Sequence, residues 1–403
     1  MNRKKRLTLA TPKATNIPPK LRVVDLFCGA GGMSLGFLDA GFDIVLAIDK
    51  WDVAVETYGR NNPQHNARQF DLSDSDSISR VVKKTRCDVI IGGPPCQDFS
   101  TAGKQIEGDR ANLTKSFAKI VQKVHPRFFV MENVPSAQQS KAFSAARRIF
   151  KQSNYGLTEI VLDASYCGVP QRRKRFFCIG ILNGVDDVLK PILTSRQTDL
   201  PTTLRDCFGD NLTFEYYYAH PRTYRRRAVF SVDEPAPTVR SGGNRPLPPD
   251  YKRHRSDPVD PVATGLRALT TDERAAIQMF PETYQWNGSR LDNELLISNA
   301  VPVGLSRFVA TSLLAFINNP NTAVVPCFTR WLSQLHGLSE SQAYHVLSRY
   351  RKARALVRSK DIGDALFLQK LINDDRLQTL SERTRTQLIE AVRLHLQFTT
   401  ENP

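Results

Sequence analysis

The feature that most constrains the fold is a series of short apolar runs, each followed by a polar turn or one rich in glycine and proline. They lie at residues 21–27, 45–48, 88–91, 128–131 and 176–182. Helix-like stretches follow the first two, at about 33–40 and 53–58. Short apolar strands that alternate with helices predict a parallel sheet with helices on both faces, and therefore an α/β fold.

Charge and cysteine content narrow the class of protein. The chain has 403 residues, with 56 Lys and Arg against 40 Asp and Glu, and 41% of its residues are hydrophobic, which excludes wholesale disorder. A net charge of +16 attracts phosphate polymers or anionic lipid, and lipid is the weaker option because no run of about 18 apolar residues is present. The seven cysteines show neither CxxC nor Cys/His spacing, so we expect neither disulfides nor a metal. The basic N-terminus lacks the apolar core of a signal peptide, which predicts a cytoplasmic protein.

Two features of the first strand–helix–strand unit indicate a nucleotide-like ligand. Residues 25–32, Asp-Leu-Phe-Cys-Gly-Ala-Gly-Gly, lie where glycine lets the backbone approach a ligand and helix N–H groups meet its anionic end. Asp49 ends the next strand about 20 residues later, as an acceptor for ribose hydroxyls does in such a unit. We therefore expect an adenosine cofactor, with NAD as one alternative and a plain tight turn as another.

Cys96 and Glu132 follow the runs at 88–91 and 128–131. Ligands of open α/β sheets bind at the carboxyl ends of the strands, so a thiolate held there by Pro94 and Pro95 is a candidate nucleophile. The alternative for Cys96 is an inert buried cysteine, which the flanking turn residues disfavour. A carboxyl group that leaves a buried strand can keep a proton and donate it to a ring nitrogen, which is the role that Glu132 suits.

Basic residues precede the run at 176–182. Arg173 and Arg175 occupy alternate positions, so in a strand-like path both side chains point the same way, into the site. We expect Arg172 and Lys174 to form a solvated basic face instead.

These motifs resemble those of the cytosine-C5 DNA methyltransferase family, in the family's order and over most of the chain. Residues 25–32 are similar to its cofactor loop, Gly-Pro-Pro-Cys-Gln at 93–97 to its nucleophile motif, Glu-Asn-Val at 132–134 to its acid motif, and Gln-Arg-Arg-Lys-Arg at 171–175 to its arginine motif. Residues 267–281 resemble the motif that closes the recognition region, and 298–302 the Gly-Asn-Ala-Val-Pro motif, with Ser298 in place of glycine. The resemblance implies a Rossmann-like, S-adenosylmethionine-dependent methyltransferase fold: α/β, with a mostly parallel sheet, a smaller target recognition domain and a helical C-terminal extension.

The same resemblance divides the chain. We expect a basic flexible arm at 1–20, a catalytic and cofactor-binding domain at 21–190, and a target recognition domain with a hinge at 191–289. A segment at 290–325 returns to complete the catalytic domain, and 326–403 form the helical extension. Between 220 and 255, nine Lys and Arg face three acidic residues, which suits contact with DNA.

The resemblance also implies a mechanism. Cys96 would attack C6 of a cytosine flipped out of double-stranded DNA, and C5 would then take the methyl group of S-adenosylmethionine. Glu132 would bind N3 and the exocyclic amine, while Arg175, helped by Arg173, would bind the O2 side. The residues implied to bind the cofactor are Phe27, Gly29, Gly31, Asp49, Asp71, Pro95, Asn299 and Val301. The family often has Trp after the ribose-binding acid, whereas here Lys50 comes first and Trp51 follows.

Residues implied to bind DNA fall into two groups. Gln97, Ser100 and Arg110 belong to the nucleophile motif and to a mobile loop at 100–113 that would close over the flipped base. The recognition region contributes Arg225, Arg226, Arg227, Arg240 and Arg245. Arg240 and Arg245 lie in a glycine-rich loop and are the predicted base contacts, the alternative being that such arginines contact only phosphate.

The implied function is that of a monomer that modifies one specific cytosine and protects DNA from a restriction enzyme. One alternative is a transfer-RNA cytosine methyltransferase, whose Cys-Phe-Thr signature resembles residues 327–329, although here the signature follows the last motif. Another is a non-catalytic DNA-binding relative, which should have lost Cys96 or Glu132. For the extension at 326–403, added DNA contacts, oligomerisation and inert packing stay open.

Overall fold

The apolar runs form one seven-stranded sheet in the computed structural model, which describes residues 20–95, 111–221, 223, 226–243, 245–318, 331–332, 336–357 and 364–401. The strand order is β3-β2-β1-β4-β5-β8-β6. The bounds are Arg22–Leu26 for β1, Asp43–Asp49 for β2, Ala67–Gln69 for β3, Val89–Gly92 for β4, Phe128–Asn133 for β5, Tyr155–Asp163 for β6 and Lys174–Leu182 for β8. All pairs from β3 to β5 are parallel, and β8 runs antiparallel to both β5 and β6. The predicted α/β fold with a mostly parallel sheet is confirmed.

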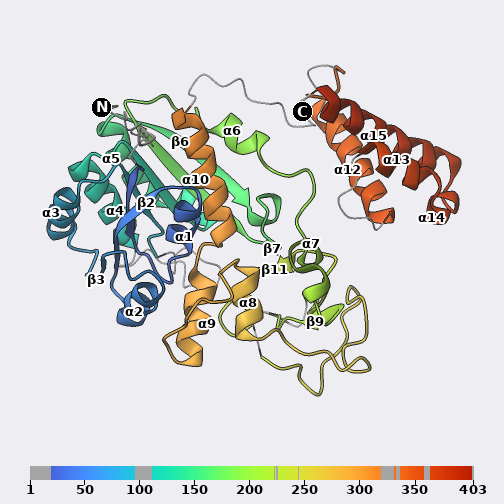
Figure 1. Ribbon diagram of the computed structural model, residues 1–403, viewed down its shortest axis with the longest axis horizontal. Coiled ribbons are helices and arrows are strands. Elements are labelled where there is room, and N and C mark those ends of the chain that lie inside the picture. Colours follow the sequence, from blue (N-terminus) through green and yellow to red (C-terminus); the bar gives the residue numbers. More distant parts are fainter. Residues whose placement is uncertain are drawn as a thin grey trace, which may run out of the picture.

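Helices cover both faces of this sheet because both faces of its strands are apolar. Val23 and Phe128 pack with α1 and α10, whereas their neighbours Val24 and Phe129 pack with α3, α4 and α5 (Figure 1). The helix bounds are Gly32–Asp39 for α1, Asp52–Asn61 for α2, Ser75–Thr85 for α3, Ala111–Val124 for α4, Lys141–Gln152 for α5 and Val303–Asn318 for α10. Buried on both sides, the central strands hold the turns at their carboxyl ends in fixed positions.

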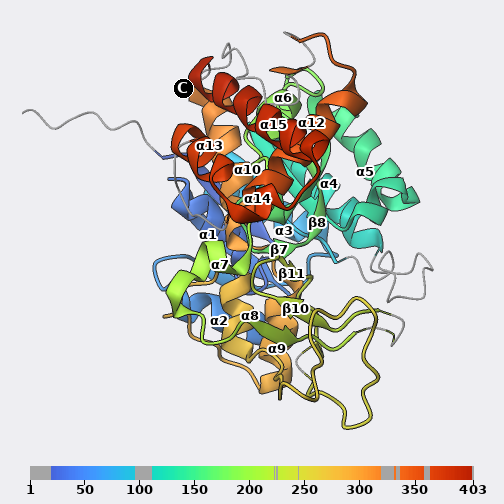
Figure 2. The same ribbon diagram turned by 90° about the vertical axis from the view of Figure 1, so that its right-hand side faces the viewer.

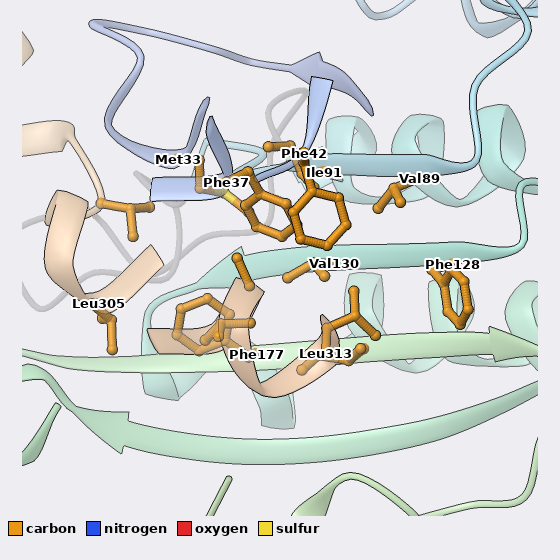
Figure 3. Packing of buried hydrophobic residues seen from close by; sticks show 14 of the residues in the cluster. Met33, Phe37, Phe42, Val89, Ile91, Phe128, Val130, Phe177, Leu305 and Leu313 are labelled. Carbon is orange, nitrogen blue, oxygen red and sulfur yellow. The ribbon is translucent and has the colours of Figure 1, made fainter. Parts of the chain in front are cut away.

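The helix α10 comes late in the chain but packs against α1. A Cβ at Gly36 of α1 would lie 2.5 Å from the Cβ of Ser306, so only glycine permits this approach. The Ser306 hydroxyl donates a hydrogen bond of 2.7 Å to the Met33 carbonyl. Figure 3 shows Leu305 and Leu313 of α10 in the same apolar cluster as Phe37 of α1. The segment after the recognition region thus completes the first core.

A smaller module follows the sheet. Its elements are α7 (Leu204–Phe208), β9 (Tyr216–Tyr218), β10 (Val229–Ser231), β11 (Ala236–Pro237) and α8 (Thr271–Ile277). The helix α6 (Lys190–Ser195), which precedes the module, packs against β6 and α10, and α9 (Arg290–Asn299), which follows it, packs against α8 and leads back to α10. The strands β9 and β10 pair antiparallel, and β11 pairs with β7 (Gln171–Arg172), which ties the module to the catalytic domain. Tyr217 and Tyr218 are buried, so the tyrosine run forms a small core rather than a polar surface.

The C-terminal residues form a helical bundle with its own core, as the sequence predicts (Figure 2). Its helices are α12 (Glu340–Leu356), α13 (Asp364–Ile372), α14 (Asp375–Gln378) and α15 (Glu382–Glu401). The His395 ring of α15 stacks on Tyr350 at 3.9 Å between centroids, and its Nε2 lies 3.0 Å from Asp199 Oδ2, which joins the bundle to the segment after α6. The guanidinium of Arg354 in α12 lies over the ring of Phe367 in α13, so this cation helps to hold the bundle together.

Among the residues that the structure describes, one stretch is long and apolar enough to cross a membrane by length and composition alone. It spans Arg290–Asn318 and contains α9 and α10. Of its apolar window, 61% is buried inside the protein, as in a core helix of a protein that spans no bilayer.

Candidate active site

A cavity of about 1120 Å³ opens at the carboxyl ends of β1, β2, β4 and β5. We call it the first cavity. It is lined by Phe27, Gly29, Asp49, Asp71, Pro95, Asn299 and Val301, all of them residues that the sequence assigns to the cofactor. Gly31 lies on the other side of the loop, where an added Cβ would lie 2.9 Å from the ring of Tyr58. Gly31 therefore shapes the loop by close packing and is absent from the lining.

The loop after β1 is built to leave space above it. Phe27 and Gly29 both have positive φ, at 63° and 52°, and nothing lies within 4 Å of the position that a Gly29 Cβ would take. The backbone N–H groups of Gly29 and Trp51 donate to the two oxygens of Asp49, at 2.9 and 3.0 Å. Burial raises the pKa of Asp49, and these two hydrogen bonds oppose the rise. The loop and the Asp49 carboxylate are thus fixed to each other around open space.

Lys50 and Asp71 form an exposed ion pair at the rim of the first cavity, with Nζ and Oδ2 2.6 Å apart. The hydrogen bond from Lys50 lowers the pKa of Asp71 to about 2. Trp51, one position after Lys50, also lines the cavity. The departure from the family pattern at Lys50 therefore places a cation on the carboxylate that the resemblance assigns to the adenine amine.

Glu132 and Arg175 form a buried ion pair at the end of β5, with Oε1 and Nε 2.8 Å apart. Burial raises the pKa of Glu132, and Arg175 and Arg173 offset this rise only in part. A Cβ at Gly93 would lie 2.9 Å from the other carboxylate oxygen, so the turn that leads to the predicted nucleophile touches the acid. Asn133 donates a hydrogen bond of 3.2 Å to the Pro94 carbonyl and holds this turn in place.

Arg173 is predicted to point into the site beside Arg175, and the structure gives it further contacts. Its side chain is almost fully buried, and its guanidinium donates to the carbonyls of Ser298, Ala300 and Val239, at 2.8, 3.0 and 3.3 Å. Arg173 thus joins the recognition module to the segment that carries Asn299. Sequence reasoning missed this connection, and no local signal could have shown it. Arg172 and Lys174 are exposed, as predicted.

A second hollow of about 1060 Å³, which we call the cleft, lies between the sheet and the recognition module. It contacts β9, β10 and β11 on one side and Arg173 and Ser136 on the other. The cleft and the first cavity share Val134, Arg175, Leu295, Ser298 and Asn299 in their linings. The two spaces therefore meet beside the Glu132–Arg175 pair.

Some residues predicted to bind DNA lie in the cleft and some do not. Arg226, Arg227 and Arg240 line it. Arg227 pairs with Glu234 and lies over the ring of Phe230, while Arg240 donates a hydrogen bond of 2.6 Å to the His220 carbonyl. Arg245 is exposed and is not part of the lining. Cys96, Gln97, Ser100, Arg110 and Arg225 lie outside the described residues, as do the arm at 1–19 and the Cys-Phe-Thr at 327–329.

Known proteins that are similar to this chain are methyltransferases. Residues 21–315 match the sequence profile of the family described as C-5 cytosine-specific DNA methylase. The chain is 48% identical to the type II methyltransferase M.HgiDI of Herpetosiphon aurantiacus over 301 residues, which is 74% of this chain and 96% of that protein. It is 47% identical to M.HindV of Haemophilus influenzae, covering 74% and 98%. The S. pombe Dnmt2 methyltransferase shares the fold, with a TM-score of 0.58 and 21% identity over 75% of this chain and all of that one.

Proposed function

Because this chain belongs to the C-5 cytosine-specific DNA methylase family, we propose that its two hollows bring a methyl donor and a cytosine together beside Glu132 and Arg175. The protein is a DNA (cytosine-5-)-methyltransferase that uses S-adenosylmethionine. With type II methyltransferases among its relatives at 47–48% identity, it is the modification enzyme of a restriction-modification system. The placement of the site rests on one observation: the first cavity and the cleft share Arg175, the partner of Glu132.

S-adenosylmethionine supplies an electrophilic methyl group when it is bound, and the first cavity suits it. The space above Gly29 admits a ligand that a side chain would exclude, and Asp49 offers carboxylate oxygens beside it. We assign stacking on the adenine to Phe27, the ribose hydroxyls to Asp49 and the adenine amine to Asp71. Pro95, Asn299 and Val301 complete the wall, and Gly31 keeps the loop in shape.

The cytosine would be bound where the two hollows meet. With its raised pKa, the carboxyl group of Glu132 is suited to share a proton with the ring nitrogen N3, and its other oxygen accepts from the exocyclic amine. Arg175 would bind O2 while it holds Glu132 in place. Cys96 directly follows Pro95 of the cavity wall, and its thiolate would attack C6. Arg173 supports both sides of the site from behind.

Double-stranded DNA would occupy the cleft, with the target base flipped toward Glu132 because the reacting carbon is inaccessible within the stack. Arg226 and Arg240 line the cleft, and Gln97, Ser100, Arg110, Arg225, Arg227 and Arg245 complete the proposed DNA-binding set. We assign 21–190 and 290–325 to catalysis and 191–289 to recognition. One chain supplies both hollows, so we propose that the protein acts as a monomer. We also propose that it acts in the cytoplasm, without a metal or a membrane.

Transfer of a radiolabelled methyl group to duplex DNA from an unmethylated host tests the proposal. We expect labelling of duplex DNA at C5 of cytosine and its loss in Cys96→Ser, with a strong decrease in Glu132→Gln. Transfer RNA, the alternative substrate, forms the second arm. Labelling of RNA alone, or labelling that survives Cys96→Ser, would overturn the assignment.

A further inference from the structure

A buried carboxyl group lies beneath the cofactor loop. Asp25 is the second-last residue of β1, two positions before Phe27, and only 1% of its surface is exposed. Its Oδ2 accepts a hydrogen bond of 2.7 Å from the Ser34 hydroxyl, while its Oδ1 has no hydrogen-bond partner within the described part of the chain. A buried carboxylate oxygen without a donor is costly, so the ionised group needs positive charge nearby.

The titratable groups around Asp25 do not provide that charge. They are Asp49 on β2, the Cys28 thiol after β1 and the Tyr58 phenol of α2. Tyr284, after α8, lies beyond Tyr58 and donates to the Ala30 carbonyl. His65 lies 3.0 Å from the Tyr58 hydroxyl, and burial lowers the pKa of this ring. Burial, together with the negative charge of Asp49, raises the pKa of Asp25 to about 7.

We propose that Asp25 makes the first cavity prefer the cationic methyl donor to its neutral demethylated product. The inference rests on the proposed position of the cofactor above residues 27–30, which line the cavity and begin two positions after Asp25. The sulfonium of S-adenosylmethionine carries a positive charge that the thioether of S-adenosylhomocysteine lacks. This charge favours the ionised carboxylate, so donor binding releases a proton that product binding does not. For unit charges about 10 Å apart at an effective dielectric constant of about 20, the effect on affinity is on the order of tenfold.

Calorimetric titration of the full-length protein with each ligand, between about pH 6 and pH 8, tests this. For the wild type we expect donor affinity to rise up to about tenfold as the carboxyl group ionises, while product affinity stays flat. We expect Asp25→Asn, which keeps the shape of the side chain, to flatten the donor profile and to reduce the preference for the donor about tenfold. Titrations in buffers of different ionisation enthalpy should show proton release with the donor only.

Two further variants keep the result decisive. His65→Gln should retain the pH response, and its loss there would make His65 the titrating group and overturn the proposal. Ser34→Ala removes the hydrogen bond to the carboxylate, so the donor profile should move to higher pH, which tests the idea even if Asp25→Asn does not fold. If the affinities of both ligands respond equally to pH, the proposed role of Asp25 is refuted, while the proposed position of the cofactor still stands. Failure of the wild type to bind either ligand refutes the cofactor position as well.

Discussion

Replacing Gly93 with alanine should damage catalysis through the acid that Gly93 touches. The new Cβ would lie 2.9 Å from Glu132 Oε2, closer than such atoms normally approach. Glu132 cannot simply retreat, because Arg175 holds its other oxygen at 2.8 Å and Gly92 pairs with Met131 between β4 and β5. Relief therefore requires the carboxylate or the turn that leads to Cys96 to shift by a few tenths of an ångström. A displacement approaching 1 Å reduces catalysis about 100-fold, so we expect kcat to fall about 10- to 100-fold.

Stability measurements separate this effect from simple unfolding. Overpacking of this kind costs about 1–3 kcal/mol, which urea unfolding of Gly93→Ala should show. Gly59→Ala is the matched control: it lies within α2, its nearest neighbour would be the Ala67 Cβ at 3.8 Å, and it should stabilise the protein by about 0.5–1 kcal/mol with unchanged kcat. A Gly93→Ala enzyme with wild-type kcat in the methyl-transfer assay would refute the reasoning, since the contact with Glu132 would then have no consequence for the chemistry.

Three further predictions concern buried charges. Because the pKa of Asp25 is raised to about 7, the folded protein binds more protons than the unfolded chain between about pH 4 and pH 7. Its free energy of unfolding should therefore fall by up to about 4 kcal/mol as the pH rises through that window. Urea unfolding of Asp25→Asn should show no such fall. Arg274→Met removes the cation that faces the buried carboxylate of Glu294 and should cost about 3–5 kcal/mol, whereas Arg274→Met with Glu294→Met should recover most of it. Asp257→Asn should reduce DNA affinity in a filter-binding assay and leave cofactor affinity unchanged, because Asp257 holds only the recognition module together.

The hydrogen bonds to Asp257 explain why its variant should act so locally. Its carboxylate accepts from the backbone N–H groups of Ala228, Val229 and His254 and from the Tyr251 hydroxyl, at 2.7–3.1 Å. Burial raises the pKa of Asp257, but these hydrogen bonds outweigh it and the pKa is lowered. The asparagine variant replaces one accepting oxygen with an N–H₂ group, and the recognition loops should loosen. Weakened cofactor binding would show that the recognition module supports the first cavity after all.

The central strands could be predicted from sequence because glycine, proline and acidic residues mark their ends. The strand β1 ends within a residue of the predicted position, since the loop after it needs Gly29 and Gly31 at positive φ. The strand β6 was missed for a physical reason: it forms one edge of the sheet, where Glu159 and Val161 face solvent in part and interrupt the apolar run. The helix α9 was also missed, although Ser289 and Asp292 form a capping box that marks its start.

The residues of the site could likewise be predicted from the sequence only in part. Each motif could be found locally because its chemistry needs a particular residue type at the carboxyl end of a strand, as for Asp49 in β2 and Glu132 in β5. The contacts between motifs could not, because they join residues more than a hundred positions apart: Arg173 to Ser298 and Ala300 is one example. Such contacts use backbone carbonyls, which every residue possesses, so the sequence carries no mark of them.

Internal ion pairs change how the positive charge of the chain bears on DNA binding. A simple count of charged residues between 220 and 255 suggests that the surplus cations contact DNA phosphates. Within that stretch, Arg227 is instead paired with Glu234 and lies over the ring of Phe230. Arg205, which precedes the stretch, pairs with both Glu215 and Asp233. A paired arginine releases fewer DNA counterions than a free one, and affinity falls with salt by a log–log slope of about 0.9 per phosphate contact. The salt dependence should therefore reflect fewer contacts than the charge count suggests, with recognition depending more on the shape of the cleft.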